Sequence, residues 1–244
     1  MDRKKFIQNT LLGGVGIIGL TSLISFQELP IYSKNDLIGK GKIPLEGKGY
    51  NLRKEASDQF IAMKKEAAKA GFNIYSVSSF RSYDRQNGIW TRKYKRYRNQ
   101  GLSPQKTIEK IIEYSTIPGT SRHHWGTDLD IVDANKKMPS NPLHAKHFEK
   151  GGVYYTFGQW LSKNASSYGF YEVYTKDPNR KGFKYEPWHF SYQPLAKLML
   201  SEFRKLDIKS LLQENKLIGS AYFTDEFIEK YTQENILDIN KKLL

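Results

Sequence analysis

Two short segments concentrate the side chains that could carry out metal-dependent chemistry. The first, residues 121–130, reads Ser-Arg-His-His-Trp-Gly-Thr-Asp-Leu-Asp and holds two of the chain's five histidines. In a strand after the glycine turn, Asp128 and Asp130 share one face, opposite Leu129 and Ile131. Carboxylates beside a turn that carries histidine could hold one metal ion. A solvated loop, with its carboxylates paired to Lys and Arg, is the alternative.

The second segment, residues 185–190, reads Tyr-Glu-Pro-Trp-His-Phe. Glu186 and His189 are three positions apart, and such positions face opposite sides of a regular strand. Pro187 cannot donate a hydrogen bond to a strand ladder, so a kink here could bring both groups to one site. A buried histidine with a surface glutamate is the alternative.

The two segments together supply a complete set of groups for a hydrolytic metal site. The chain has no cysteine, so a transition metal must use histidine and carboxylate ligands. A catalytic zinc takes three protein ligands and keeps one open position, and His123, Asp130 and His189 supply three. Glu186 then remains as a base that can take a proton from water.

Composition and charge narrow the class of protein. The 244 residues include 39 Lys and Arg against 25 Asp and Glu, and the chain carries a formal charge of +14. This excess favours an anionic partner, which could be nucleic acid or a cell envelope. The mean hydropathy of −0.63 excludes a membrane bundle over the whole chain. The length is sufficient for a core that needs no disulfides.

The first residues have the layout of an export segment. Arg3, Lys4 and Lys5 precede an uncharged run from Leu11 to Phe26, as in a bacterial export signal. The run is shorter than the roughly 20 residues that cross a bilayer. We therefore expect residues 1–28 to be an export signal or an N-terminal membrane anchor, and the protein to lie outside the cytoplasm in the periplasm or cell envelope. A buried core helix is the alternative, and export weakens the case for nucleic acid.

The remaining pattern predicts a mixed fold. Residues 29–50 are expected to form an extended linker, residues 51–205 a single domain and residues 206–244 a helical C-terminal extension. Helices are expected at 51–70, 83–99, from Pro104, at 156–168 and from Pro194, and strands at 73–80, 129–132, 170–174 and 186–191. This order of helices and scattered strands indicates an α+β fold with a small antiparallel sheet.

Several spaced motifs together resemble the zinc D-alanyl-D-alanine carboxypeptidases of the VanY type. Ser-x-His-x-x-Gly-x-x-x-Asp from Ser121, followed by Glu-x-Trp-His from Glu186, is similar to the signature of that family. The run 78–83, Ser-Ser-Phe-Arg-Ser-Tyr, is similar to its upstream element, and Pro-Gly-Thr at 118–120 to the start of its zinc motif. The resemblance covers about residues 50–195 and implies a fold of the type found in lysostaphin-like and hedgehog-like proteins.

The resemblance implies a role for each matched residue. The zinc ligands would be His123, Asp130 and His189, and the catalytic base Glu186. Arg81 would bind or polarise the substrate, with Gln86 and Ser121 also lining its site. Asp128, which replaces a small residue of the family pattern, and Trp188 would lie next to the ligands. His124 is expected beside the site or on the surface, and we expect no role for His144 or His147.

The implied reaction is hydrolysis of a C-terminal D-Ala bond in peptidoglycan stem peptides. The partners would be those peptides and an anionic envelope, with no nucleic acid, and the protein would be a monomer. An endopeptidase that cuts wall cross-links with the same zinc site is one alternative. A non-catalytic module that binds cell wall or nucleic acid is another, because Tyr94 and Tyr97 interrupt the basic run from Arg92 to Arg98 in a way compatible with stacking.

Overall fold

The centre of the fold is one antiparallel sheet of four strands. The structure, a computed structural model, describes residues 32–214 and 216–244. The strands are β1 (Ile74–Ser78), β2 (Asp128–Asp133), β3 (Phe170–Glu172) and β4 (His189–Tyr192), and their order in the sheet is β1-β2-β4-β3. The expected α+β class with a small antiparallel sheet is confirmed.

The register of the two central strands brings the two predicted segments side by side. Asp130 of β2 pairs with His189 of β4, and Asp128 pairs with Ser191. Leu129 packs in an apolar core, while Asp128 contacts His189 on the opposite face of the sheet. The alternation expected along this strand is therefore present, and it places the polar groups of both segments on one face.

One face of the sheet is covered by α2 (Lys54–Lys69) and α5 (Tyr155–Asn164). Phe60 and Met63 of α2 and Phe157 of α5 pack with Leu129 and other apolar residues of the sheet in one buried cluster. The N-cap of α2 is Arg53, two residues after Asn51, which the sequence indicated as the cap.

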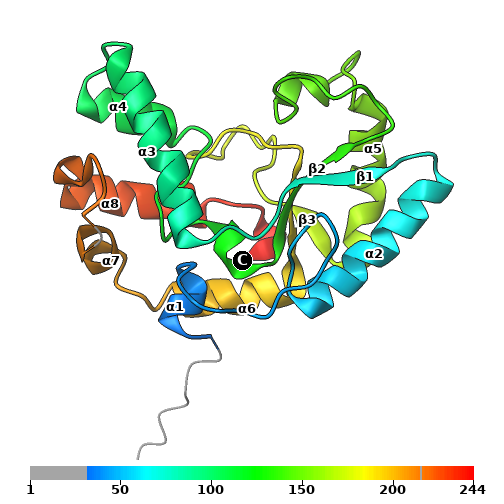
Figure 1. Cartoon of the computed structure of the whole chain (residues 1–244), viewed down its shortest axis with the longest axis horizontal. Helices are drawn as coiled ribbons and strands as arrows, with labels where there is room; N and C mark the ends of the chain where they lie inside the picture. The colour runs from blue at the N-terminus through cyan, green and yellow to red at the C-terminus, as the bar shows by residue number, and fades with distance from the viewer. Residues whose placement is uncertain (1–31, 215) are drawn as a thin grey trace, which may run out of the picture.

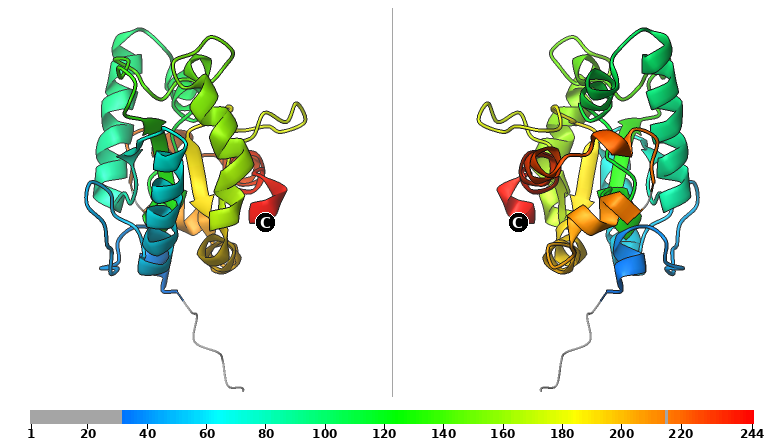
Figure 2. Two further views of the ribbon diagram at one scale, coloured as in Figure 1. Left: turned by 90° about the vertical axis from the view of Figure 1, so that its right-hand side faces the viewer. Right: turned by 90° about the vertical axis from the view of Figure 1, so that its left-hand side faces the viewer.

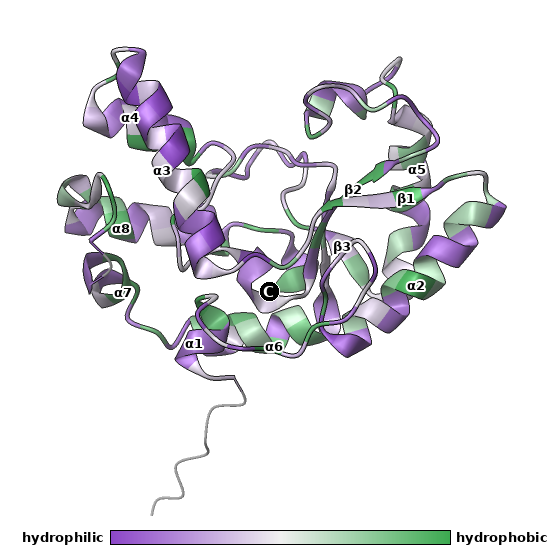
Figure 3. Cartoon of the chain, in the orientation of Figure 1, coloured by the Kyte–Doolittle hydropathy of each residue, from purple (hydrophilic) through white to green (hydrophobic). Residues whose placement is uncertain are grey.

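Helices on the other side of the sheet build a second core next to the polar face. They are α3 (Tyr83–Asn99), α4 (Pro104–Ile111), α6 (Gln193–Phe203), α7 (Ile208–Glu214) and α8 (Asp225–Tyr231). Ser82 and Ser103 cap the N-termini of α3 and α4 with their hydroxyls. Helix α3 carries many hydrophilic residues, whereas α6 is largely apolar (Figure 3). The polar face of the sheet thus lies next to a basic helix.

Residues 32–50, the described part of the segment expected to be an extended linker, are folded, which corrects that prediction. A short helix, α1 (Lys34–Leu37), starts with a capping box between Ser33 and Asp36. Leu37 and Ile38 are buried in the second core, and the Leu37 carbonyl accepts a hydrogen bond from the Trp125 indole. These apolar side chains, together with Tyr50 in the first core, bind the stretch to the domain.

The residues after 206 also belong to the main body and not to a separate extension. Leu212, Phe223 and Tyr231 are buried in the same core as Trp90 of α3. The C-terminal segments, orange to red in Figure 2, lie against the rest of the fold. Helices are present after residue 206 as expected, but their apolar side chains pack in the core of the main domain. The expected export segment, residues 1–28, lies outside the described residues. Within residues 32–214 and 216–244, no helix combines the length and apolar character that a membrane crossing needs.

Candidate metal centre

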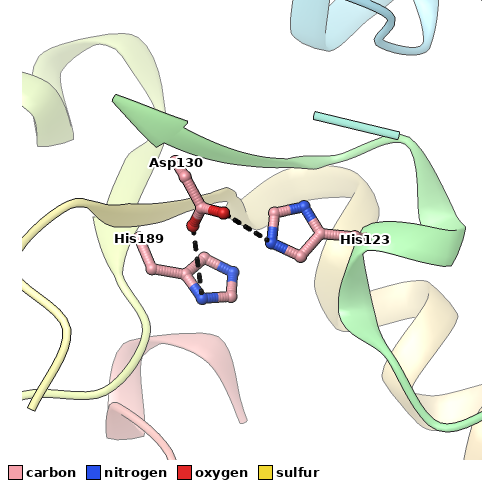
Figure 4. Close-up of side chains that lie close together, drawn as sticks. All are labelled: His123, Asp130 and His189. Carbon is pink, nitrogen blue, oxygen red and sulfur yellow. Dashed lines mark ion pairs between the residues drawn. The ribbon is translucent and has the colours of Figure 1, made fainter. Parts of the chain in front are cut away.

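Three side chains from three different elements converge on one point at the polar face of the sheet. His123 comes from a short 3-10 helix (Arg122–Trp125), Asp130 from β2 and His189 from β4. One potential ligand atom from each lies within 4.8 Å of the other two (Figure 4). Gly126 ends the 3-10 helix in the left-handed conformation, with φ of 70°, and so turns the chain from His123 into β2.

The hydrogen bonds of His123 leave one ring nitrogen available to a metal. Its Nδ1 lies 2.8 Å from the Ser79 carbonyl oxygen. A carbonyl can only accept, so Nδ1 carries the proton and Nε2 presents a lone pair. That Nε2 lies 3.4 Å from Oδ2 of Asp130. Burial lowers the pKa of His123, which favours the neutral imidazole that a metal requires.

His189 is oriented by carboxylates on both sides of its ring. Nε2 donates to Oδ2 of Asp128 at 2.9 Å, and Nδ1 lies 3.0 Å from Oε2 of Glu186 and 4.0 Å from Oδ1 of Asp130. Burial opposes a charged ring, but the hydrogen bonds to Asp128 and Glu186 raise the pKa of His189 to about 10. Without a metal, Nδ1 therefore keeps a proton at the position where a cation would bind.

Asp128 itself is held by four groups. Thr127 and Ser191 donate to Oδ1 at 2.7 and 2.6 Å, and Arg122 Nε donates to Oδ2 at 3.1 Å. Burial would raise the pKa of Asp128, yet Arg122 and His189 keep it well below its usual range. Asp128 is thus a fixed anion that sets the orientation of His189, as carboxylates behind metal-binding histidines do.

Asp130 carries the clearest sign that a cation belongs here. Its Oδ1 is buried and has no hydrogen-bond partner among the residues that the structure describes. An anionic oxygen without a partner is costly in a protein interior, and a bound metal would remove that cost. His123, Asp130 and His189 together offer two imidazole nitrogens and one carboxylate, a donor set that suits zinc.

Glu186 lies at the site outside the three potential ligands, and its carboxylate contacts one of them, His189, at 3.0 Å. A turn through Pro187, closed by a hydrogen bond from the His189 amide to the Glu186 carbonyl, brings both side chains to one side. Glu186 and His189 therefore reach the same site although they are three positions apart. The alternation of a strand does not apply to Glu186, because β4 begins only at His189. Burial raises the pKa of Glu186, and the hydrogen bond from His189 partly offsets that effect. A raised pKa suits a group that must both take and release a proton.

Arg81 faces the site from the turn before α3. Its guanidinium donates to Gln86 Oε1 at 2.7 Å and to Ser78 Oγ at 2.9 Å, and it lies 3.9 Å from Oδ2 of Asp130. Burial lowers the pKa of Arg81, which remains charged because an arginine pKa starts so high. Arg81 thus contacts groups within the site and does not form a surface ion pair with its neighbour Asp84.

Of the two other residues expected to line the substrate site, Ser121 does so and Gln86 does not. Gln86 is fully buried, donates to the Thr116 carbonyl and does not line the cavity; it holds Arg81 in place. The expectation that Gln86 lines the substrate site is therefore wrong in this structure. Ser121 does line the cavity beside His123.

A cavity of about 530 Å³ opens onto these groups. Its walls come from α3, from the segment after α4, from residues 141–144 and from the turn before β4. Its lining includes Arg81, His123, Asp130, Glu186, Trp188 and His189. The three potential metal ligands, Glu186 and Arg81 thus all line one space that can admit a peptide.

The remaining predicted residues lie near the site without entering the ligand set. Trp188 lines the cavity, and its carbonyl accepts a hydrogen bond from the Ile131 amide at 3.0 Å. His124 is buried, accepts from the Gly119 amide and bonds to the Arg81 carbonyl through Nδ1, so it is not on the surface. His144 lines the cavity, although no role was expected for it.

Sequence reasoning missed Arg122 and Lys93. Arg122 is buried and neutralises Asp128, and Lys93 lines the cavity. Both lie within or next to motifs that were recognised, but each is one basic residue among 39. Only the placement of Arg122 between Ser121 and His123 could have singled it out.

The architecture and the site define a hydrolase-type metal centre in an α+β fold. Two imidazoles and a carboxylate, with a buried glutamate beside them, are the composition found in zinc peptidases. Residues 49–195 match the family model described as VanY: D-alanyl-D-alanine carboxypeptidase. The chain belongs to this family, as the motifs indicated.

Individual relatives agree with that assignment. The chain is 28% identical over 162 residues to a D-alanyl-D-alanine carboxypeptidase of Enterococcus faecium, covering 66% of this chain and 43% of the relative. It is 30% identical over 142 residues to YodJ of Bacillus subtilis, covering 58% of this chain and 46% of YodJ. The chain thus spans less than half the length of these two relatives.

A solved structure shares the fold. VanYB in complex with D-alanine-D-alanine superposes with a TM-score of 0.52 at 19% identity, covering 78% of this chain and 96% of VanYB. The helices and small antiparallel sheet described above are therefore a known arrangement.

Proposed function

We propose that this protein is a zinc-dependent carboxypeptidase that removes a C-terminal D-Ala from peptidoglycan stem peptides. The observation that carries the proposal is the convergence of His123, Asp130, His189 and Glu186 on one cavity in a chain of the VanY family. The D-Ala-D-Ala ligand of VanYB supports the choice of substrate.

Zinc would be held by Nε2 of His123, a carboxylate oxygen of Asp130 and Nδ1 of His189. The unpartnered Oδ1 of Asp130 and the free lone pair of His123 fit a cation at this point. Bound zinc would polarise the scissile carbonyl and lower the pKa of water to about 7.

The chain's own residues supply proton transfer and orientation. Glu186, with its pKa raised by burial, takes the proton of the attacking water and passes it to the departing amine. His189 stays oriented throughout because Asp128 holds its Nε2. Arg81, fixed by Gln86 and Ser78, presents a planar cation to the substrate carboxylate or to the developing oxyanion.

The position of Arg81 favours a carboxypeptidase over a cross-link endopeptidase. Its side chain is only 14% exposed, and among the described residues Asp130, at 3.9 Å, is the one carboxylate within 4.0 Å of the guanidinium. Two neutral groups hold it, so the charge of the guanidinium remains available to an incoming carboxylate. A free C-terminus supplies such a group, whereas the middle of a cross-link does not.

The binding-module alternative loses its structural support. Tyr94 is only 7% exposed and packs against Gly219, so its ring is not available for stacking on a ligand. The basic run of α3 therefore lacks one of the two aromatic contacts on which that alternative depended.

The test uses a stem pentapeptide and the same peptide with an amidated C-terminus, with products identified by mass. We expect release of one alanine from the free acid and at least tenfold slower cleavage of the amide. Equal cleavage of both would contradict a carboxypeptidase and favour the endopeptidase. The mass of the released fragment also separates loss of one D-Ala from loss of a dipeptide.

We also propose that the protein acts outside the cytoplasmic membrane, where such peptides are assembled into the wall. The basic residues before the uncharged run from Leu11 to Phe26 support this location. Fractionation of cells that express the native chain tests it. Recovery of the protein only from the soluble cytoplasm would contradict the location.

A further inference from the structure

Helix α3 presents a row of side chains along one wall of the cavity. Ile89, Lys93 and Arg96 all line it, at the helical spacing of four and then three residues. The same face begins with Gln86, which holds Arg81. The helix therefore extends the cationic surface of the cavity outward from Arg81.

The cationic side chains that line the cavity differ in the hydrogen bonds and ion pairs that they make within the protein. Arg122 is paired with Asp128 at 3.1 Å, and Arg81, to which the C-terminal carboxylate is assigned above, is held in place by Gln86 and Ser78. Lys93 makes no hydrogen bond or ion pair with any residue that the structure describes. Burial lowers the pKa of Lys93, while the negative charge of Glu186 opposes that shift. A half-buried ammonium without a partner is a costly arrangement that an anionic ligand would relieve.

We propose that Lys93, with Arg96 at the outer end, forms a subsite for a second carboxylate of the substrate, on the acyl side of the scissile bond. The inference rests on the proposed function, because it assumes that the C-terminal carboxylate lies near Arg81. It names a substrate class: stem peptides that carry a free acidic group upstream of the D-Ala that is removed.

The distances along α3 fit such a peptide. Lys93 and Arg96 follow Gln86 by about 10 and 15 Å along the helix axis, at about 1.5 Å per residue. An extended peptide advances about 3.3–3.6 Å per residue, so about 10 Å corresponds to roughly three residues. A carboxylate two or three residues before the C-terminus would therefore reach Lys93.

Two groups of a stem peptide meet that description. One is the α-carboxylate of a γ-linked D-Glu at the second position, and the other is the side-chain carboxylate of diaminopimelate at the third. Their chemistry is the same, and Lys93 could pair with either. Four pentapeptides distinguish the two sources: D-Glu with a free or amidated α-carboxylate, each combined with Lys or diaminopimelate at the third position.

The variants isolate the charge at this one position. Lys93→Gln removes the charge, Lys93→Arg keeps it, and Lys95→Gln removes an exposed charge from the same helix outside the cavity. For the wild type we expect a higher kcat/KM for the peptides with the extra carboxylate. Lys93→Gln should reduce that preference about tenfold, mainly through KM, whereas Lys93→Arg and Lys95→Gln should keep it.

Two outcomes would overturn the subsite. One is a wild type that cleaves peptides with the extra carboxylate, at either position, no better than the peptides that lack it. The other is an equal loss on all four peptides in Lys93→Gln, which would mean that Lys93 acts only through the charge of Glu186. Calorimetric binding of the four peptides to a Glu186→Gln protein provides a readout without turnover. A preference in binding without hydrolysis by the wild type would retain the subsite and reject the proposed reaction.

Discussion

Asp128 and His189 face each other across the two central strands, with Oδ2 of the carboxylate 2.9 Å from Nε2 of the ring. The contact joins the two motifs, which are 61 positions apart in the chain. It also fixes which nitrogen of His189 faces Asp130 and Glu186. Asp128 is thus a positioning residue for the metal centre.

Asp128→Asn tests that role, because the amide keeps the shape but loses the anion that holds Nε2–H. We expect zinc affinity, measured by competitive titration with a chelator, to fall about 10- to 100-fold. Asp58→Asn is the matched control, since Asp58 is exposed and paired with Lys54 on α2. An unchanged zinc affinity in Asp128→Asn would show that the ring is held without the carboxylate's charge.

Arg81→Lys tests the planar cation. Lysine cannot contact Gln86 and Ser78 and also present a fork to a carboxylate, so it should perform nearly as poorly as alanine. Loss of a buried charge partner costs about 2–5 kcal/mol, so kcat/KM for the free acid should fall at least roughly thirtyfold. Arg85→Lys, on the exposed side of α3, is the control. Retention of most activity in Arg81→Lys would mean that charge alone is sufficient.

Tyr231→Phe tests whether the C-terminal helices support the site. The Tyr231 hydroxyl accepts from the Ile117 amide at 3.0 Å and bonds to Thr120 Oγ1 at 2.8 Å, in the segment just before the His123 motif. Loss of this buried partner costs about 1–3 kcal/mol. We expect a Tm at least about 2 °C lower, since each kcal/mol corresponds to roughly 2–4 °C at this length. Tyr222→Phe, which is exposed, should not change the Tm; equal Tm values for both variants would refute the support.

Glu172 predicts a specific pH dependence of stability. Burial raises the pKa of Glu172 to about 7, from an ordinary value of 4.5, and Arg180 only partly opposes this. The folded state therefore prefers the protonated group, and the stability present below pH 4.5 is lost as the pH rises through 7. Glu172→Gln removes that titration.

The measurement is the Tm of wild type and Glu172→Gln at pH 5 and pH 8. At pH 8 the variant should be more stable than the wild type by at least about 2 °C, and this advantage should shrink at pH 5. Glu149→Gln, an exposed change, should show no such dependence. The same Tm difference at both pH values would contradict a titration of Glu172.

Part of the candidate metal centre could be predicted from sequence, because alternation along a strand places Asp128 and Asp130 on one face whatever the rest of the fold does. The proximity of Glu186 and His189 was harder to predict, because it depends on the turn at Pro187 and on where β4 begins. Sequence alone does not reveal that turn, although proline pointed to an irregularity.

Other features depend on packing between distant segments. Gln86 is buried because the Thr116 carbonyl and Arg81 satisfy its amide, and both partners come from other elements. The integration of Leu37 and Tyr231 into one core likewise depends on contacts with residues about 80 or more positions away. Periodicity identified the local elements but not these partners.

The most direct test of the account is Glu186→Gln, which keeps the shape of the side chain and removes the base. We expect the purified variant to bind one zinc per chain and to release D-Ala from a stem pentapeptide about 10²–10⁴-fold more slowly than the wild type. His123→Ala with His189→Ala provides the comparison for a lost metal. Near-normal turnover by zinc-loaded Glu186→Gln would contradict the proposed mechanism.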